Sequence, residues 1–224
     1  MRGGCATGTM NTRNPVVYVI DDDASVRGAI RNLLESVALA AETYGSPQEF
    51  LNAFRPDSPG CLILDIRLPE GSGLDFQTSL INRGVHIPII FITGHGDVAM
   101  SVRAMKAGAV EFLTKPFRQQ ELLDSIYHAI ERDRADRERQ AERADIRNRY
   151  KSLTRREVEV MGLVVAGMSN KQIASKIGIQ KATVKFHRGK VMAKMRADSV
   201  PDLVRIVEHL DPTRPESRSY ATNG

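Results

Sequence analysis

Short apolar segments alternate with amphipathic ones through the first 130 residues. The clearest is Leu62-Ile63-Leu64, which ends at Asp65 and is followed by the turn-forming sequence Leu68-Pro69-Glu70-Gly71-Ser72-Gly73. Uninterrupted apolar runs of this length predict strands that are buried on both faces of a parallel sheet. We expect the other strands at Val16–Ile20, Ala40–Tyr44, Ile87–Ile92 and Val110–Leu113.

The segments between these strands have the periodicity of helices. Val26, Ile30, Leu33 and Val37 recur at spacings of three and four, with Asp23 as a candidate N-cap. Shorter helices are expected from Pro47, near Leu74 to Ile81, and from a cap at Asp97 to Lys106. Strands that alternate with helices predict an α/β fold with a doubly wound, five-stranded parallel sheet of the flavodoxin-like kind.

Polar residues stand where the predicted strands end. With right-handed crossovers, the carboxyl ends of parallel strands meet at one edge of the sheet. The residues that this rule brings together are Asp21, Asp22, Asp65, Thr93 and Lys115.

A long helix should follow the sheet. Its apolar stripe runs from Leu122 to Ile130, and residues 131–149 are then almost all charged, Gln or Ala. Opposite charges four residues apart, such as Asp133 and Arg137, stabilise such a helix in water by about 0.3 kcal/mol per pair. We interpret 131–151 as a charged helical linker; the alternative, a coiled-coil seam, lacks an apolar heptad beyond Ile130.

The last third of the chain predicts a small all-α domain. Thr154 with Glu157 and Ser169 with Gln172 form capping-box patterns, and Gly167 and Gly178 end the helices that they open. Two short helices joined by a tight turn make a helix-turn-helix. Two further helices are expected, at about 181–196 and 199–210.

These patterns divide the chain into five parts. We expect a disordered extension at 1–14, the α/β domain at 15–130, the linker at 131–151, the helix-turn-helix domain at 152–210 and a disordered tail at 211–224.

The charge is concentrated in the last third. Residues 151–224 hold 14 Lys and Arg against 7 Asp and Glu, whereas residues 1–150 hold 18 against 20. A basic domain joined to an acidic one indicates that only the former binds a polyanion.

Cys5 and Cys61 are too few for a disulfide framework or a zinc site, and no apolar run approaches the ~20 residues of a membrane span. We therefore expect a cytoplasmic protein without a membrane partner.

The acidic residues at the sheet edge predict phosphoryl chemistry. Asp21, Asp22 and Asp65 would repel one another without a cation, and oxygen ligands beside a phosphate favour Mg²⁺. Asp65 could then attack phosphorus and become an aspartyl phosphate, while Lys115 and the Thr93 hydroxyl bind phosphoryl oxygens. A phosphatase with an aspartate nucleophile is an alternative, but it would need a second Asp where Arg67 stands.

Four motifs resemble the receiver domain of bacterial response regulators. They are Ile20-Asp21-Asp22, Leu64-Asp65 with Leu68-Pro69, Ile92-Thr93-Gly94 and Lys115-Pro116-Phe117. The resemblance implies phosphorylation of Asp65 by a sensor histidine kinase, and no other enzymatic activity. It implies a Mg²⁺ site made by Asp22, Asp65 and the backbone carbonyl of Arg67, with Asp21 bound through water. It also implies that Phe112 is a switch aromatic and that Lys115-Pro116 is cis.

Residues 152–210 resemble the LuxR-type helix-turn-helix of the NarL/FixJ regulators. The motifs are Leu153 to Glu157, Gly167 to Ala174 and Thr183 to His187. The third helix of this domain fits the major groove of double-stranded DNA. Val184, His187, Val191 and Met195 share one face and should point to the core. The candidate DNA-contacting residues are Ser169, Asn170, Lys171, Lys181, Thr183, Lys185, Phe186, Arg188, Gly189 and Lys190.

Together the two resemblances predict a transcriptional response regulator in which phosphorylation of Asp65 controls DNA binding. We expect it to form a homodimer on phosphorylation and to act with RNA polymerase. A rival mechanism is the release of an inhibitory contact between the domains. A phosphorylation-independent DNA-binding regulator is a further alternative, against which the intact Asp65, Thr93 and Lys115 argue.

Overall fold

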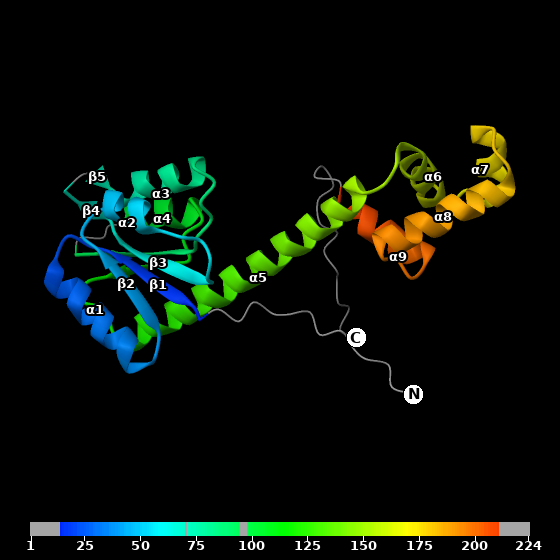
Figure 1. The fold of residues 1–224 in the computed structure, drawn as a ribbon. Helices are drawn as coiled ribbons and strands as arrows, with labels where there is room; N and C mark the ends of the chain where they lie inside the picture. The colour runs from blue at the N-terminus through cyan, green and yellow to red at the C-terminus, as the bar shows by residue number, and fades with distance from the viewer. Residues whose placement is uncertain (1–13, 70, 95–97, 211–224) are drawn as a thin grey trace, which may run out of the picture. The chain divides into compact units, whose positions relative to one another are not determined.

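The computed structural model describes residues 14–69, 71–94 and 98–210 (Figure 1). The chain divides between Arg137 and Glu138 into two compact units. The first contains a sheet with its helices, and the described part of the second, residues 138–210, contains helices and no strand. No helix in the described ranges is both long and apolar enough to cross a membrane.

The sheet of the first unit has five parallel strands in the order β2-β1-β3-β6-β7. Their bounds are Val16–Ile20 (β1), Ala40–Tyr44 (β2), Gly60–Asp65 (β3), Ile89–Thr93 (β6) and Glu111–Thr114 (β7). β1, β3 and β6 lie in the middle and are buried on both faces, which explains their uninterrupted apolar sequences. The predicted doubly wound parallel sheet is confirmed.

Helices cover both faces of this sheet (Figure 1). They are α1 (Ala24–Ser36), α2 (Pro47–Ala53), α3 (Gly73–Asn82), α4 (Val98–Lys106) and the first part of α5 (Gln119–Lys151). Asp23 caps α1 as predicted, since its side chain accepts a hydrogen bond from the Ser25 N–H at 2.7 Å. The predicted cap of α4, Asp97, lies outside the described residues.

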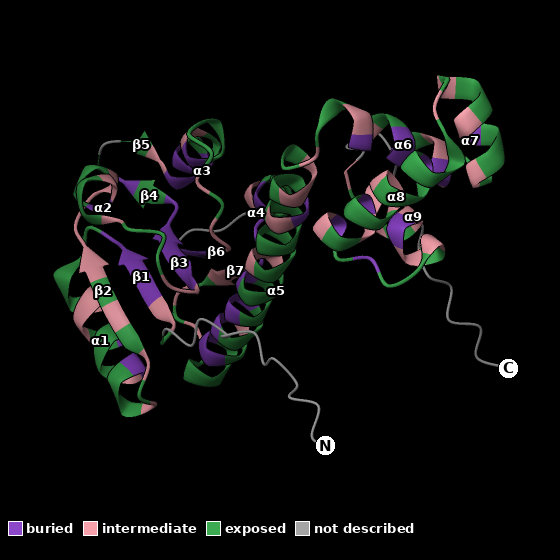
Figure 2. Cartoon of the chain, turned by 45° about the vertical axis from the view of Figure 1, so that its right-hand side comes forward, coloured by how far each residue is buried: buried purple, intermediate pink, exposed green. Residues whose placement is uncertain are grey.

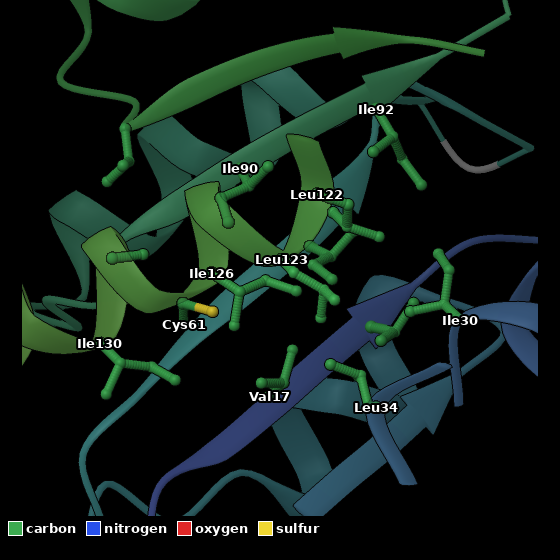
Figure 3. Close-up of a cluster of buried hydrophobic side chains, with 14 residues drawn as sticks. Val17, Ile30, Leu34, Cys61, Ile90, Ile92, Leu122, Leu123, Ile126 and Ile130 are labelled. Atoms are coloured by element: carbon green, nitrogen blue, oxygen red, sulfur yellow. The ribbon is translucent and has the colours of Figure 1, made fainter. Parts of the chain in front are cut away.

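Two apolar clusters separate the helices from the sheet. Successive strand residues point to opposite faces, so Val17 and Val19 of β1 join one cluster while Tyr18 and Ile20 join the other. The first cluster packs α1 and α5 on the sheet, through residues such as Leu34 and Ile126 (Figure 3). The second packs α2, α3 and α4 on the other face. Buried residues are concentrated in the central strands and on the inner faces of the helices (Figure 2).

β7 lies one residue further along the chain than predicted, and the structure differs from the sequence prediction at two further places in this unit. The predicted turn after Asp65 contains a small antiparallel pair, β4 (Arg67–Leu68) and β5 (Gly71–Ser72). Two-residue strands are too short to show a periodic pattern. β6 begins at Ile89 rather than Ile87 because Pro88 has no N–H to donate, although its carbonyl accepts from Leu62 N at 2.9 Å.

The second unit, as far as Leu210, is built from four helices and the end of α5. They are α6 (Arg155–Val165), α7 (Asn170–Ile177), α8 (Lys181–Met195) and α9 (Val200–Glu208). Both predicted capping boxes are present, at Thr154 and Ser169, and Gly178 ends α7 in the left-handed conformation. The core includes Ile146, Val160, Ile173, Val184, Val191 and Leu203.

Candidate functional site

An acidic cluster lies at the carboxyl edge of the sheet. Asp21 and Asp22 follow β1, and Asp65 ends β3, the strand beside it. One ligand oxygen from each lies within 4.8 Å of the others. Asp21 and Asp65 are buried, whereas Asp22 is exposed. Three carboxylate oxygens this close, one of them open to solvent, could hold a hard divalent cation.

Lys115 bridges two of these carboxylates. Its Nζ lies 2.6 Å from Asp21 Oδ2 and 2.6 Å from Asp65 Oδ2. Lys115 directly follows β7, and its backbone N–H donates to the Thr93 carbonyl at 2.7 Å, which holds it at the end of β6. The cluster has three carboxylates and one ammonium group, so these four groups together carry a negative charge when all are ionised.

The pKa values in the cluster reflect burial and this ion pairing. Burial raises the pKa of Asp21 above its ordinary value, although the hydrogen bond from Lys115 acts in the opposite direction. Burial alone would lower the pKa of Lys115, but its hydrogen bonds to Asp21 and Asp65 outweigh that effect and raise it. Lys115 is therefore a fixed cation at neutral pH.

The other predicted receiver residues lie next to Asp65 or on the two strands that follow β3 in the sheet. Asp65 Oδ1 accepts a hydrogen bond from the Arg67 backbone N–H at 2.9 Å. Thr93, fully buried, ends β6, the strand next to β3. Phe112 on β7 is half-buried and packs against the second apolar cluster. The Lys115-Pro116 bond is cis, as the resemblance implied.

Two neighbours of the cluster carried no signal in the sequence. Arg27 Nη1 donates to the backbone carbonyl of Asp21 at 2.6 Å, which ties α1 to the end of β1. A Cβ at Gly73 would lie 2.4 Å from the backbone oxygen of Asp65, so only glycine allows α3 to begin this close to the site. A single arginine or glycine is too common to be recognised without the fold.

A second candidate site is the surface formed by α7 and α8. Most of its predicted DNA-contacting residues are exposed: Ser169, Lys171, Lys181, Thr183, Lys185, Phe186, Gly189 and Lys190. Asn170 and Arg188 are half-buried, and Arg188 Nη1 donates to Asn170 Oδ1 at 3.0 Å. These two residues join α7 to α8. Gln180 makes no capping side-chain hydrogen bond at the start of α8.

The opposite face of α8 packs against the core of its unit. Val184, Val191 and Met195 are buried, as predicted, while His187 is half-buried beside the Phe186 ring. The face with Lys185 and Lys190 is consequently turned to solvent.

The fold and the two sites define a class of protein: a receiver-type α/β domain followed by a helix-turn-helix. Comparison with protein families agrees. Residues 17–127 match the response regulator receiver domain, and residues 151–207 match the bacterial regulatory proteins of the luxR family.

The relatives are similar over most of their length. The chain is 52% identical to nodulation protein W of Bradyrhizobium diazoefficiens over 195 residues, which are 87% of this chain and 86% of that protein. It is 46% identical to response regulator protein TodT of Pseudomonas putida, covering 92% of each. The structure of response regulator StyR aligns with a TM-score of 0.81 at 45% identity, covering 88% of this chain and 99% of that one.

A full-length structure of FixJ from B. japonicum aligns with a TM-score of 0.53 at 38% identity, over 87% of this chain and 96% of that one. The chain belongs to the response regulators of the NarL/FixJ family, which combine a receiver with a LuxR-type helix-turn-helix. It is a transcriptional response regulator.

Proposed function

We propose that Asp65 is the phosphoacceptor through which a sensor histidine kinase controls this regulator. The observation that best supports this proposal is the position of the Asp65 carboxylate at the end of a strand. Its Oδ2 lies 2.6 Å from Lys115 Nζ, and two further aspartates lie beside it. Its oxygen would attack the phosphorus of a phosphohistidine, so that a P–O bond forms as the P–N bond breaks and the imidazole leaves. The receiver would catalyse only its own phosphorylation and dephosphorylation.

The acidic cluster would hold Mg²⁺ through Asp22, Asp65 and the backbone carbonyl of Arg67, with Asp21 bound through water. The fit rests on the three carboxylate oxygens within 4.8 Å of one another. The ion would supply charge neutralisation for the phosphoryl oxygens. Lys115 would exchange its contact with Asp65 for one phosphoryl oxygen, and the Thr93 hydroxyl would donate to another.

The phosphoacceptor is tested with a small phosphodonor such as acetyl phosphate and Mg²⁺, with phosphorylation measured by intact-protein mass. Wild type should gain one phosphoryl group, and Asp65→Asn should gain none. Asp75→Asn on the exposed surface of α3 is the matched control and should behave like wild type. Chelation of Mg²⁺ should stop labelling. Full labelling of Asp65→Asn would show that the acceptor lies elsewhere.

For the output domain we propose that α8 enters the major groove of promoter DNA. The exposed Lys185 and Lys190 on this helix support the placement. Lys185→Ala should relax base preference at one position, at a cost of about 1–3 kcal/mol. Lys181→Ala should weaken binding to all sequences alike and reduce its salt dependence. Wild-type binding by both variants would show that α8 is not the recognition helix.

We further propose that phosphorylation pairs two copies through the receiver surface formed by α4, β7 and the start of α5. Three exposed apolar side chains on α4 support this: Val98, Val102 and Met105 are 79%, 44% and 45% exposed. Displacement of Thr93 by a phosphoryl group would alter the burial of Phe112 on the adjacent β7. A dimer would present two recognition helices to half-sites about 34 Å apart.

The alternative, release of an inhibitory contact between receiver and helix-turn-helix, predicts a phosphorylated monomer that binds DNA. Sedimentation of the full chain with and without phosphodonor separates the two mechanisms.

The active form would work in the cytoplasm, where promoters and RNA polymerase are. We expect it to contact RNA polymerase there.

A further inference from the structure

Phe186 is an exposed aromatic residue in the middle of α8. Its side chain is 62% exposed, and it is the only large hydrophobic residue of the described positions 138–210 that is mainly exposed. Of the other large apolar residues of α8, Val184, Val191 and Met195 are buried in the core, and Met192 is partly buried against it. An exposed phenylalanine on a polar surface is a candidate for a contact with a partner.

The surroundings of Phe186 leave the ring accessible. Helical side chains lean toward the N-terminus of their helix, and the residue one turn before Phe186 on that side is Ala182. On the other side lies Gly189, where an added Cβ would meet no atom within 4 Å. Ala182 and Gly189 are both exposed and too small to shield the ring. A surface could therefore approach α8 closely at this point.

Two neighbours restrict the ring. Lys190 Nζ lies 5.7 Å from the ring centroid, within the range of a cation–π contact. The His187 ring meets Phe186 in an edge arrangement, with 5.7 Å between centroids. The ring is thus supported by residues of its own helix, which lowers the entropy that it would lose on binding.

The base edges in the major groove are polar except at one place. The C5-methyl of thymine is the apolar group that the groove of unmodified DNA displays, and apolar side chains contact it. A phenylalanine placed against any other base edge would remove water from donors and acceptors that it cannot replace.

We propose that Phe186 is a specificity-determining residue that packs on the C5-methyl group of a pyrimidine, thymine in ordinary DNA, in the major groove. Lys185 and Lys190, which flank it on the exposed face, would bind neighbouring purine edges or phosphates. This proposal rests on the proposed placement of α8 in the groove and goes beyond it by naming the base that the ring selects.

The test begins with selection of binding sites from random duplexes by the phosphorylated full chain. Each thymine of the selected site is then replaced in turn by deoxyuridine, which removes only the methyl group. Affinities are measured by fluorescence anisotropy for wild type and Phe186→Ala. At one position this replacement should lower the DNA affinity of wild type about fourfold, which is the effect expected for one buried methyl group. The same replacement should not change the affinity of Phe186→Ala, which should already be weaker.

Further measurements test whether the methyl group itself is recognised. At the sensitive position, 5-methylcytosine should restore affinity relative to cytosine for wild type but not for Phe186→Ala. Phe186→Leu, which keeps an apolar group, should retain part of the response to the methyl. Because Phe186 is exposed, Phe186→Ala should unfold at the temperature of wild type.

Two kinds of failure are distinguishable. If Lys185→Ala weakens binding but no thymine methyl separates wild type from Phe186→Ala, the Phe186 proposal is wrong and the groove placement stands. If neither Lys185→Ala nor Phe186→Ala changes binding, the placement of α8 itself is wrong. An equal loss for Phe186→Ala on single-stranded oligonucleotides would overturn methyl recognition in favour of base stacking.

Discussion

Asp133 in α5 accepts a hydrogen bond from the backbone N–H of Gly60, the first residue of β3, at 2.9 Å. The Asp133 side chain is buried, and Arg137 Nε lies 2.6 Å from the same carboxylate oxygen. Arg137 also donates to the Pro56 carbonyl at 2.9 Å. This polar cluster attaches α5 to the first unit beyond residue 130, where the sequence placed the end of the α/β domain and the start of the linker.

Removal of the Asp133 carboxylate should destabilise the first unit. Asp133→Ala leaves the buried Gly60 N–H without its acceptor, which should lower the free energy of unfolding by about 1–3 kcal/mol. Glu131→Ala is the control, because Glu131 is exposed and its ion pair with the neighbouring Arg134, at 2.5 Å, lies on the surface of the helix. Urea unfolding of the full chain measures both. Equal stability of the two variants would show that the Gly60 contact contributes nothing.

A charge on α4 should prevent pairing of receivers. Val102→Asp places a carboxylate in the apolar surface of α4 and should keep the phosphorylated chain monomeric, while phosphorylation of Asp65 continues. Ile81→Asp on α3 is the matched control, since Ile81 is 50% exposed but lies outside the proposed surface. Sedimentation velocity with phosphodonor distinguishes them. A dimer that persists in Val102→Asp, or a wild type that remains monomeric, contradicts this interface.

Glu157 should make the second unit sensitive to acid. Its carboxylate is 2.6 Å from Lys194 Nζ and also accepts from the Thr154 N–H at 2.8 Å. The hydrogen bond from Lys194 lowers the pKa of Glu157 below its ordinary value of 4.5. A pKa that is lower in the folded state stabilises the fold above pH 4.5, and this stabilisation is lost as the pH falls through the folded value.

Wild type should therefore melt at a higher temperature than Glu157→Gln at pH 7, and the difference should shrink below about pH 4.5. Glu159→Gln on the same helix, from an exposed pair with Arg156, should show little difference at either pH. Calorimetry of the full chain at several pH values measures both. A difference for Glu157→Gln that is constant with pH would rule out this linkage.

Substitution of Gly189 by alanine should change stability and DNA affinity in opposite directions. In the middle of α8 a glycine costs about 1 kcal/mol relative to alanine, and a Cβ there would meet no atom within 4 Å. Gly189→Ala should thus raise the free energy of unfolding by about 1 kcal/mol yet weaken DNA binding, since the added methyl lies on the proposed groove face. Gly28→Ala, at an equally open position in α1, should stabilise without affecting DNA affinity. Unchanged DNA binding by Gly189→Ala would place that face outside the interface.

Much of this protein follows from local pattern. Uninterrupted apolar runs are found only where both faces of a strand are covered, so β1, β3 and β6 and the parallel sheet could be predicted from sequence. The convergence of Asp21 and Asp65 at one sheet edge follows from the direction of parallel strands. The capping boxes at Thr154 and Ser169 are short-range hydrogen bonds, and they formed as predicted.

Other features depend on contacts between distant residues. Sequence spacing predicted the pair of Asp133 with Arg137, but not that Asp133 also binds Gly60, which is 73 positions away. Asn170 and Arg188 were predicted as separate DNA contacts, and the packing of α7 on α8 joins them.

The bridge from Lys115, after β7, likewise depends on how far a flexible side chain reaches past the end of β6 to Asp65 on β3 and to Asp21 after β1. Periodicity reports which face of an element is buried, because burial follows local apolar content. It carries no information about which polar atoms meet, since that is decided only when the elements pack together.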